Sequence, residues 1–200
     1  MNERLKAIYD ELYGIIAARS DEYARSVEDQ CAVWEGRIPV EQPLLCSGAL
    51  PETGGAGPWP KFSSREIHGD KDSMLISGMI GMASSALGGM QSVPSIRANM
   101  GCGIFPSLFP GIVSRLFDDD RMPWITEHLD KETIKKLRPQ DIKLTDEFKL
   151  GLDHMAYMVK MLDGTGTYVY PMDLQDAVDI AHLVYGDQFF YDLYDDPDFI

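Results

Sequence analysis

Helices with marked ends alternate with short apolar segments along this chain, and this alternation restricts the fold more than any other feature. Each predicted helix begins at Asp or Thr with acidic residues in its first turn, which suit the positive end of a helix. These helices span residues 70–90, 130–137 and 145–162. The predicted strands lie within residues 92–98 and 167–171, and Pro171 ends the second. Because a helix is the usual crossover between parallel strands, the pattern predicts an α/β fold.

An amphipathic stripe predicts another helix in the first 20 residues. Its apolar residues recur three or four positions apart, with Glu and Lys on the outer side. The stripe consists of Leu5, Ile8, Leu12, Ile15 and Ile16. We therefore divide the chain into an N-terminal helical segment, residues 1–33, and an α/β region, residues 34–200.

Three other segments have less regular patterns. Residues 38–50 hold two prolines and short apolar pieces, which predict a strand or an extended segment. Residues 47–60 are rich in Gly and Pro and predict a loop, either a surface connection or a place of motion or binding. Residues 105–117 predict a broken helix.

The charge of the chain narrows the class of partner. The 18 Lys and Arg residues against 32 Asp and Glu residues give a net charge of -14, which repels nucleic acid and anionic membrane surfaces. The chain has no apolar run of the roughly 20 residues that span a bilayer, and its first 20 residues lack the apolar core of a signal peptide. Three widely spaced cysteines provide no disulfide framework, so we expect a cytoplasmic protein.

An α/β chain of this kind forms either an open doubly wound sheet or a (β/α)8 barrel. The phosphate-binding fingerprints G-x-G-x-x-G and G-x-x-x-x-G-K-[ST] are absent, which disfavours a nucleotide-binding open sheet. In both architectures the functional residues follow the carboxyl ends of the strands. Polar residues just after the two predicted strands are therefore the first candidates for a site.

Arg97 lies at the end of the first of these strands, and Asn99 follows it. At alternate positions of an extended segment they point the same way, and the glycines that follow let a ligand approach the backbone. A guanidinium beside an amide suits a substrate carboxylate. Arg97 could equally pair with one of the many acidic side chains of the protein.

Asp173 and Gln175 follow the second strand. Asp173 could act as a general acid or base, or accept hydrogen bonds from ligand N–H groups, while Gln175 holds the ligand in place. Either Asp173 or Asp176 could instead cap the next helix. His182 lies three residues after Asp179 on that helix, a spacing that could orient the imidazole for substrate binding.

Signals for metal and nucleophile chemistry are weak. His68, His128 and His154 have no partner at ligand spacing, so no metal site is predicted. Cys102 lies between two glycines without a His nearby in sequence. The methionines of residues 70–90 predict adaptable core packing rather than a metal or cofactor box. They are Met74, Met79, Met82 and Met90.

Two segments carry a family resemblance. "VPSIRANMGCGIFPSLF" and "YPMDLQDAVDIAHLVYGDQFFYDLYDDPDF" resemble members of the uroporphyrinogen decarboxylase superfamily, particularly its divergent bacterial decarboxylase-like and methyltransferase-like branch. The resemblance implies a (β/α)8 TIM barrel with its pocket at the carboxyl ends of the strands. It implies an enzyme that decarboxylates a tetrapyrrole or a smaller carboxylate without a cofactor, with arginines on the carboxylates and an aspartate on ligand N–H groups.

The same resemblance leaves two alternatives open. Some relatives transfer methyl groups with zinc and a corrinoid protein, and a non-catalytic half-barrel subunit that needs a partner is the other alternative. The arginine-rich motif of the decarboxylases is absent here, and Asp176, Ala177 and Val178 stand where the family has Gly-Pro-Phe or Gly-Ala-Pro. These differences favour the methyltransferase-like branch, whereas the family resemblance as a whole favours the decarboxylase.

The last residues suggest an incomplete barrel. Asp195, Asp196 and Pro197 form a helix-start signal with only three residues after it. An unclosed barrel would leave strand edges and apolar helix faces in water. We therefore expect the N-terminal half of a barrel, which further sequence, a second copy or another chain completes.

Overall fold

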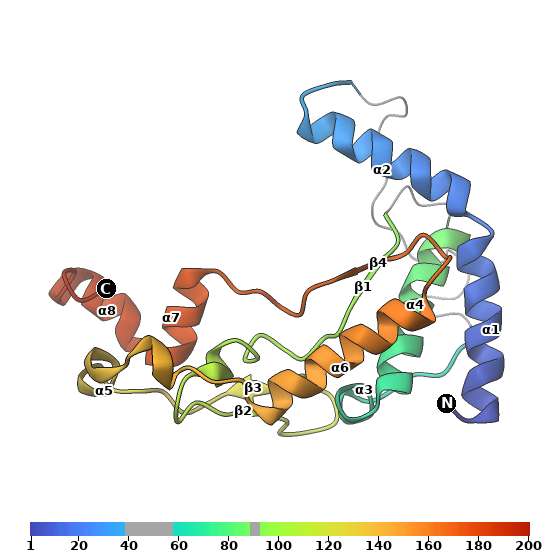
Figure 1. Ribbon diagram of the computed structural model, residues 1–200. Coiled ribbons are helices and arrows are strands. Elements are labelled where there is room, and N and C mark those ends of the chain that lie inside the picture. Colours follow the sequence, from blue (N-terminus) through green and yellow to red (C-terminus); the bar gives the residue numbers. More distant parts are fainter. Residues whose placement is uncertain (39–57, 89–92) are drawn as a thin grey trace.

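The protein has a mixed α/β fold that is mostly helical (Figure 1). The computed structural model describes residues 1–38, 58–88 and 93–200. Its helices are α1 Glu3–Ala17, α2 Ser20–Trp34, α3 Ser64–Gly69, α4 Lys71–Leu87, α5 Lys131–Lys136, α6 Asp146–Met161, α7 Ala177–Tyr185 and α8 Gln188–Asp195. Its strands are β1 Ser95–Arg97, β2 Ser114–Arg115, β3 Trp124–Ile125 and β4 Tyr168–Tyr170. None of the helices in these ranges is long and apolar enough to cross a membrane.

The helix starts that the sequence predicted are confirmed. Asp70, Asp130 and Thr145 each accept a hydrogen bond from the backbone N–H three residues later, at 2.9, 2.8 and 3.2 Å. Such caps satisfy a donor that has no partner inside the helix. The helix predicted in the first 20 residues is α1, and α2 follows it and ends at Trp34. The division of the chain after residue 33 stays a prediction.

The two predicted strands are neighbours in a parallel pair. Ile96 of β1 lies opposite Val169 of β4, and Arg97 lies opposite Tyr170. The connection between the two strands includes α5, α6 and an antiparallel hairpin of β2 and β3. The α/β prediction therefore holds. In the described part of the chain the strands form these two two-stranded sheets.

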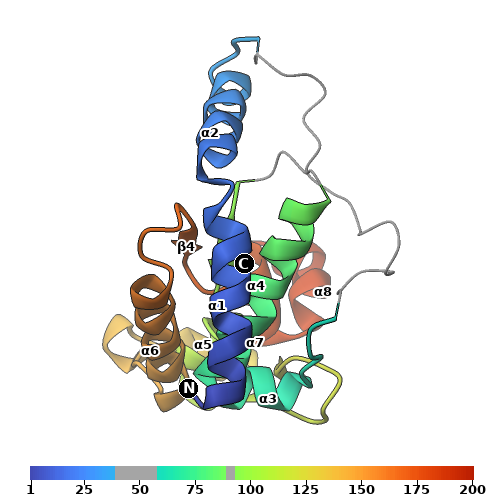
Figure 2. The same cartoon turned by 90° about the vertical axis from the view of Figure 1, so that its right-hand side faces the viewer.

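The main core lies between the helices and the parallel pair. Leu12 of α1, Met79 of α4 and Met158 of α6 are completely buried in one apolar cluster with Ile96 of β1. Figures 1 and 2 show α1, α4 and α6 gathered around this core, with α2 projecting beyond it. Helix α4 approaches β1 closely, since a Cβ atom at Gly78 would lie 2.3 Å from Cδ1 of Ile96.

The core contains most of the methionines of the 70–90 segment. Met74, Met79 and Met82 are buried on α4, as expected for core packing residues. Met90 lies outside the described residues, as do almost all of the predicted strand at 38–50 and most of the predicted loop at 47–60.

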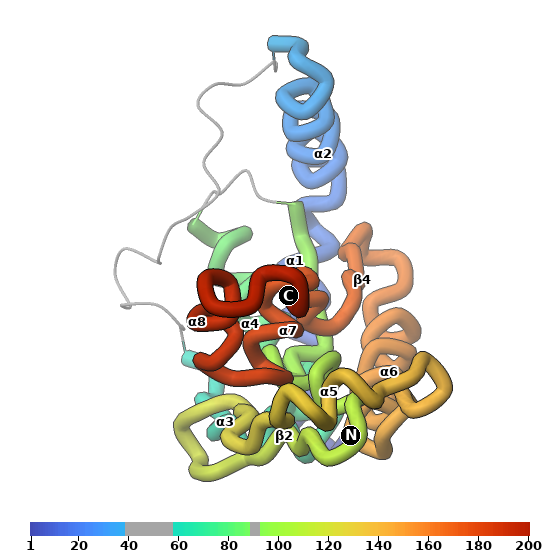
Figure 3. The backbone as a smooth tube through the Cα atoms, turned by 90° about the vertical axis from the view of Figure 1, so that its left-hand side faces the viewer, coloured from blue at the N-terminus to red at the C-terminus, as the bar shows by residue number. Residues whose placement is uncertain are grey.

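A second, smaller apolar cluster lies toward the C-terminus. It joins Ile112 and Ile125 of the hairpin region to Leu183 and Val184 of α7. The backbone N–H of Leu129 donates to the carbonyl of Val184 at 2.8 Å. In Figure 3, α7 and α8 lie on the side nearest the viewer, in front of α4.

A buried carboxylate fastens α8 to α5. Asp192 is 5% exposed and accepts hydrogen bonds from Lys131 at 2.7 Å, Tyr185 at 2.6 Å and Gln188 at 3.1 Å. The Lys131 ammonium, followed by the Tyr185 hydroxyl, lowers the pKa of Asp192 to about 2. Lys131 also pairs with Asp196 at 2.8 Å, so one cation holds both ends of the last helical turn.

Two local predictions are wrong. Residues 105–117 form a 3-10 turn at Pro106–Leu108 followed by β2, because the second proline and Gly111 end the helical turn. The Asp195–Pro197 segment ends a helix instead of starting one. An apolar stripe of Phe and Leu residues forms α8 before it, and Pro197 cannot continue that helix.

Candidate functional site

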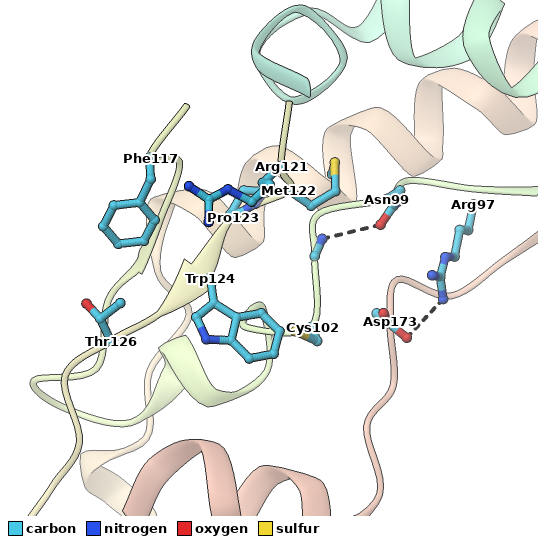
Figure 4. A pocket seen from close by; sticks show the side chains of 11 residues that line it. Arg97, Asn99, Cys102, Phe117, Arg121, Met122, Pro123, Trp124, Thr126 and Asp173 are labelled. Carbon is cyan, nitrogen blue, oxygen red and sulfur yellow. Dashed lines mark hydrogen bonds and ion pairs between the residues drawn. The ribbon is translucent and has the colours of Figure 1, made fainter. Parts of the chain in front are cut away.

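A cavity of about 790 Å³ lies beside the carboxyl end of the parallel strand pair (Figure 4). One side carries Arg97 at the end of β1 and residues that follow β1 and β4, and the other side belongs to the hairpin of β2 and β3. It is lined by Arg97, Asn99, Gly101, Cys102, Phe117, Arg121, Met122, Pro123, Trp124, Thr126 and Asp173. Three of the five predicted site residues, Arg97, Asn99 and Asp173, therefore share one cavity.

Alternation along the first strand places Arg97 and Asn99 in this cavity. Ile96, Ala98 and Met100 are buried in the main core, at 4% exposure or less. The residues between them point to the opposite face, because successive side chains of an extended chain alternate. Arg97 and Asn99 are accordingly half-buried and face the cavity, as the sequence predicted.

Arg97 and Asp173 form an ion pair across the carboxyl ends of the two strands. Nη1 of Arg97 donates to Oδ1 of Asp173 at 2.9 Å, and the two side chains are 31% and 24% exposed. Arg97 therefore pairs with an acid, one of the two alternatives that the sequence left open, and it also lines the cavity. Its binding of a substrate carboxylate stays a prediction. Asp176 caps α7 through the N–H of Asp179 at 2.9 Å, which leaves Asp173 for Arg97.

A glycine brings the hairpin against the β1 side of the cavity. Gly101 has a φ of +78°, and a Cβ atom there would lie 2.7 Å from the backbone carbonyl oxygen of Pro123. The Gly101 N–H donates to Oδ1 of Asn99 at 3.4 Å, which is a long hydrogen bond. The NH2 group of the Asn99 amide, with its two N–H donors, therefore points away from Gly101. A side chain at Gly101 would therefore separate the two walls of the cavity.

The hairpin supplies an aromatic wall that the sequence analysis missed. Ile125 is buried at 1% exposure, whereas its neighbour Trp124 is 50% exposed and lines the cavity together with Phe117. The alternation of Trp124, Ile125 and Thr126 is a strand signal, but it is only a few residues long. In the structure Ser114 lies opposite Ile125, and this pairing identifies the short alternating segment as a strand.

Polar contacts fix the turn of this hairpin. Oδ1 of Asp118 accepts from the N–H groups of Asp120 and Arg121 at 3.0 and 2.9 Å, and its Oδ2 accepts from the Arg121 side chain. The next residue, Asp119, accepts from the Ser64 N–H and from the Arg65 guanidinium, both at 2.6 Å. These hydrogen bonds connect the hairpin turn, and with it the aromatic wall, to the start of α3.

Cys102 faces the cavity as a neutral thiol. Burial raises the pKa of Cys102, and the negative charges of Asp173 and Asp179 raise it further. A thiolate is the nucleophilic form of cysteine, so this environment disfavours nucleophilic catalysis by Cys102. Its sulfur instead adds a soft, polarizable contact to the wall.

Gln175 and His182 lie outside the cavity. His182 is on α7, where Nε2 lies 3.2 Å from Oδ1 of Asp187 and the imidazole packs on Phe190 at 4.8 Å between ring centroids. Its partner is therefore Asp187 near α8, not the predicted Asp179. The cap at Asp176 starts α7 immediately after Gln175, and this helix carries His182 toward α8.

A second group of titratable side chains lies between α3 and α6. Nε2 of His68 is 3.6 Å from Oε1 of Glu147, and His154 of α6 is 2% exposed. Burial raises the pKa of Glu147 to about 7 and lowers the pKa values of His68 and His154. This cluster could not be predicted from the sequence, because His68 is far along the chain from Glu147 and His154.

Replacing Glu147 by Gln is expected to change how stability depends on pH. Between pH 4.5 and 7 the folded state keeps a proton on Glu147 that the unfolded state releases, so the contribution of Glu147 to stability falls as pH rises. The Gln variant lacks this loss. After allowance for solvent screening we expect a relative gain on the order of 1 kcal/mol for the variant between pH 4.5 and pH 8.

Urea unfolding at pH 4.5, 6 and 8 measures this difference. Glu132→Gln, at an exposed glutamate of α5, is the matched control and should show no such trend. A gap between the wild type and the Glu147 variant that stays constant over this pH range would contradict the expectation.

In residues 1–38, 58–88 and 93–200, no group of three or more His, Cys, Asp or Glu side chains is arranged to hold a metal ion. The prediction that the protein uses no cofactor stays a prediction. Comparisons of the chain with family models, with curated proteins and with solved structures find no match. The geometry of the cavity is therefore the basis on which its chemistry is proposed.

Proposed function

We propose that the cavity binds a small carboxylate and that the protein is a decarboxylase of the uroporphyrinogen decarboxylase type. One observation carries this proposal: Arg97, Asn99 and Asp173, from two neighbouring parallel strands, line a single cavity. Their position at the carboxyl ends of the strands is where α/β enzymes hold their substrates. The resemblance of residues 93–109 and 170–199 to that superfamily supports the same conclusion.

The guanidinium of Arg97 is the anchor for the carboxylate. It has five N–H donors in a planar fork, and Asp173 engages it through Nη1. Asp173 also holds the guanidinium in place, so the ligand meets an oriented cation. The Asn99 amide adds neutral donors beside it, which suits an anion that must bind in a protein of net charge -14.

Asp173 also has a role in the proposed reaction. When a ring carbon that bears the carboxylate takes up a proton from water, positive charge develops on the ring and its N–H groups. The bond to the carboxylate then breaks, its electron pair returns to the ring, and CO2 leaves. The Asp173 carboxylate would accept a hydrogen bond from such an N–H and stabilise the charge as it develops.

We propose in addition that β1 and β4 belong to a (β/α)8 barrel of which this chain forms the N-terminal half. Their parallel pairing across a helical connection supports this, as do the apolar residues on the outer side of α8. Phe190, Tyr191 and Tyr194 are 51, 64 and 93% exposed, a face that another part of a barrel or a second copy would cover. A structure of the assembled protein in which no further parallel strand joined β1 or β4 would end this part of the proposal.

Replacing Arg97 by Ala is expected to weaken carboxylate binding by about 10- to 150-fold. The loss corresponds to one charge-assisted hydrogen-bonding group, worth about 1.5–3 kcal/mol. Titration of cyclohexanecarboxylate, followed by ligand-observed NMR, measures the affinity, and the neutral cyclohexanecarboxamide shows how much of it depends on charge. Equal affinity of the variant and the wild type for the acid would exclude Arg97 as the anchor.

Asp173→Asn is the matched control for this experiment. It removes the acid that shares the guanidinium, so an acid without N–H groups should bind more tightly, not less. Release of labelled CO2 from carboxyl-labelled pyrrole-2-carboxylate, an aromatic acid whose ring carries an N–H group, then tests the reaction itself. The label should appear as CO2 with the wild type and not with the Arg97 variant.

A further inference from the structure

We propose that the carboxylate ligand of this cavity is aromatic and that its ring lies against Trp124 of the β2–β3 hairpin, an inference that rests on the carboxylate site proposed above. Trp124 is then the residue that determines specificity. Arg97 and Asp173 belong to one wall of the cavity and Trp124 to the other (Figure 4). The aromatic wall also carries Arg121, whose guanidinium is already paired with Asp118. A ligand that satisfies both walls has an anionic end and a flat apolar end.

The register of the hairpin turns its aromatic side chains into the cavity. Trp124 lies opposite Arg115, while Ile125 lies opposite Ser114 on the buried face. Phe117, two residues after Arg115, is on the same face as Trp124 by alternation. Trp124 and Phe117 are 50% and 51% exposed, so about half of each large side chain remains open to a ligand.

The surroundings of Trp124 favour a ring over a flexible chain. The indole face carries negative electrostatic potential and the edge of an aromatic ligand carries positive potential, so stacked and edge-to-face contacts gain energy beyond burial of area. The neutral Cys102 thiol lines the same cavity, and sulfur next to an aromatic ring is a favourable contact. A saturated ring of the same size gains the burial but not these contacts.

The contacts of the hairpin favour a wall that is in place before the ligand arrives. The turn is held by Asp118 from within and by α3 through Asp119, and Pro123 packs against Gly101. A pre-organised aromatic wall loses little entropy when a ligand binds. The volume of about 790 Å³ is in the usual range for a small-molecule site.

The test compares benzoate with cyclohexanecarboxylate, two acids of similar size, and uses benzamide as the neutral aromatic probe. Wild type is expected to bind benzoate roughly 2- to 12-fold more tightly than cyclohexanecarboxylate. Trp124→Leu should remove this preference and leave the affinity for cyclohexanecarboxylate nearly unchanged. Trp124→Phe should restore part of the preference, and Trp34→Leu, at an exposed residue of α2, should keep all of it.

The outcomes separate this inference from the proposed function. Equal binding of both acids by wild type, or a preference that persists in Trp124→Leu, overturns the inference and leaves the carboxylate site standing. No binding of either acid, or benzamide binding as tight as benzoate binding, overturns the carboxylate site and the inference with it. Complete loss of the preference in Trp124→Leu, partial loss in Trp124→Phe and no loss in Trp34→Leu supports both.

Discussion

Replacing Gly101 by Ala should destabilise the protein by roughly 2–5 kcal/mol and abolish binding in the cavity. Two costs add at this position. The φ of +78° is unfavourable for any residue with a Cβ atom, by roughly 1–2 kcal/mol. The new Cβ would also lie 2.7 Å from the carbonyl oxygen of Pro123, and forcing a group into a packed interior costs roughly 1–3 kcal/mol.

The clash with the Pro123 carbonyl is the reason why this variant should also lose ligand binding. The atom in conflict belongs to the backbone of the hairpin, so rotation of a side chain cannot relieve the clash. The hairpin must move away from β1, and the aromatic wall moves with it. Cyclohexanecarboxylate and benzoate should therefore both lose affinity at temperatures where the variant is still folded.

Gly166→Ala is the matched control. Gly166 has a φ of +73°, but a Cβ atom there would meet nothing within 4 Å. This variant should cost only the roughly 1–2 kcal/mol of the backbone conformation and should bind ligand normally. Urea unfolding and ligand titration of both variants measure the two effects. Similar losses of stability in both would mean that the contact with Pro123 contributes nothing.

Replacing Gly78 by Ala should destabilise the protein by roughly 1–3 kcal/mol. The added Cβ atom would lie 2.3 Å from Cδ1 and 2.6 Å from Cγ1 of Ile96, a β-branched residue that is 4% exposed in the core. Its side chain has few alternative rotamers, so β1 itself must shift away from α4. Because Arg97 is the next residue of β1, affinity for carboxylates should fall as well.

Gly81→Ala, one helical turn later, is the control for this variant. A Cβ atom at Gly81 would meet nothing within 4 Å, and alanine is favoured over glycine inside a helix by roughly 1 kcal/mol. The two variants should therefore shift the midpoint of urea unfolding in opposite directions. A Gly78 variant as stable as the Gly81 variant would mean that α4 and β1 are not in close contact in solution.

The elements that could be predicted from sequence are those with a local cause. Asp70, Asp130 and Thr145 start helices because each accepts a hydrogen bond from a backbone group three residues away. The strands β1 and β4 were predicted from short apolar segments, and alternation showed that Arg97 and Asn99 share a face. The hairpin and α3 were missed, because two-residue strands and a six-residue helix carry too short a pattern.

The same distinction between local and long-range causes applies to the candidate site. Residue types and alternation predicted Arg97, Asn99 and Asp173 as candidates. The partner of Arg97, the aromatic wall and the cluster around Glu147 could not be predicted, since each depends on segments that meet only after folding.

The sequence by itself determined where the predicted helices begin and that Arg97 and Asn99 share one face of their extended segment. These properties depend on neighbours within a few residues, and backbone hydrogen bonding fixes them locally. Only the tertiary structure decided that Asp173, 76 residues after Arg97, would be its partner, and that Trp124 would line the opposite wall. The physical reason is that burial of α4 against β1 and the close approach of Gly101 to Pro123 bring these segments together, and no local pattern records such contacts.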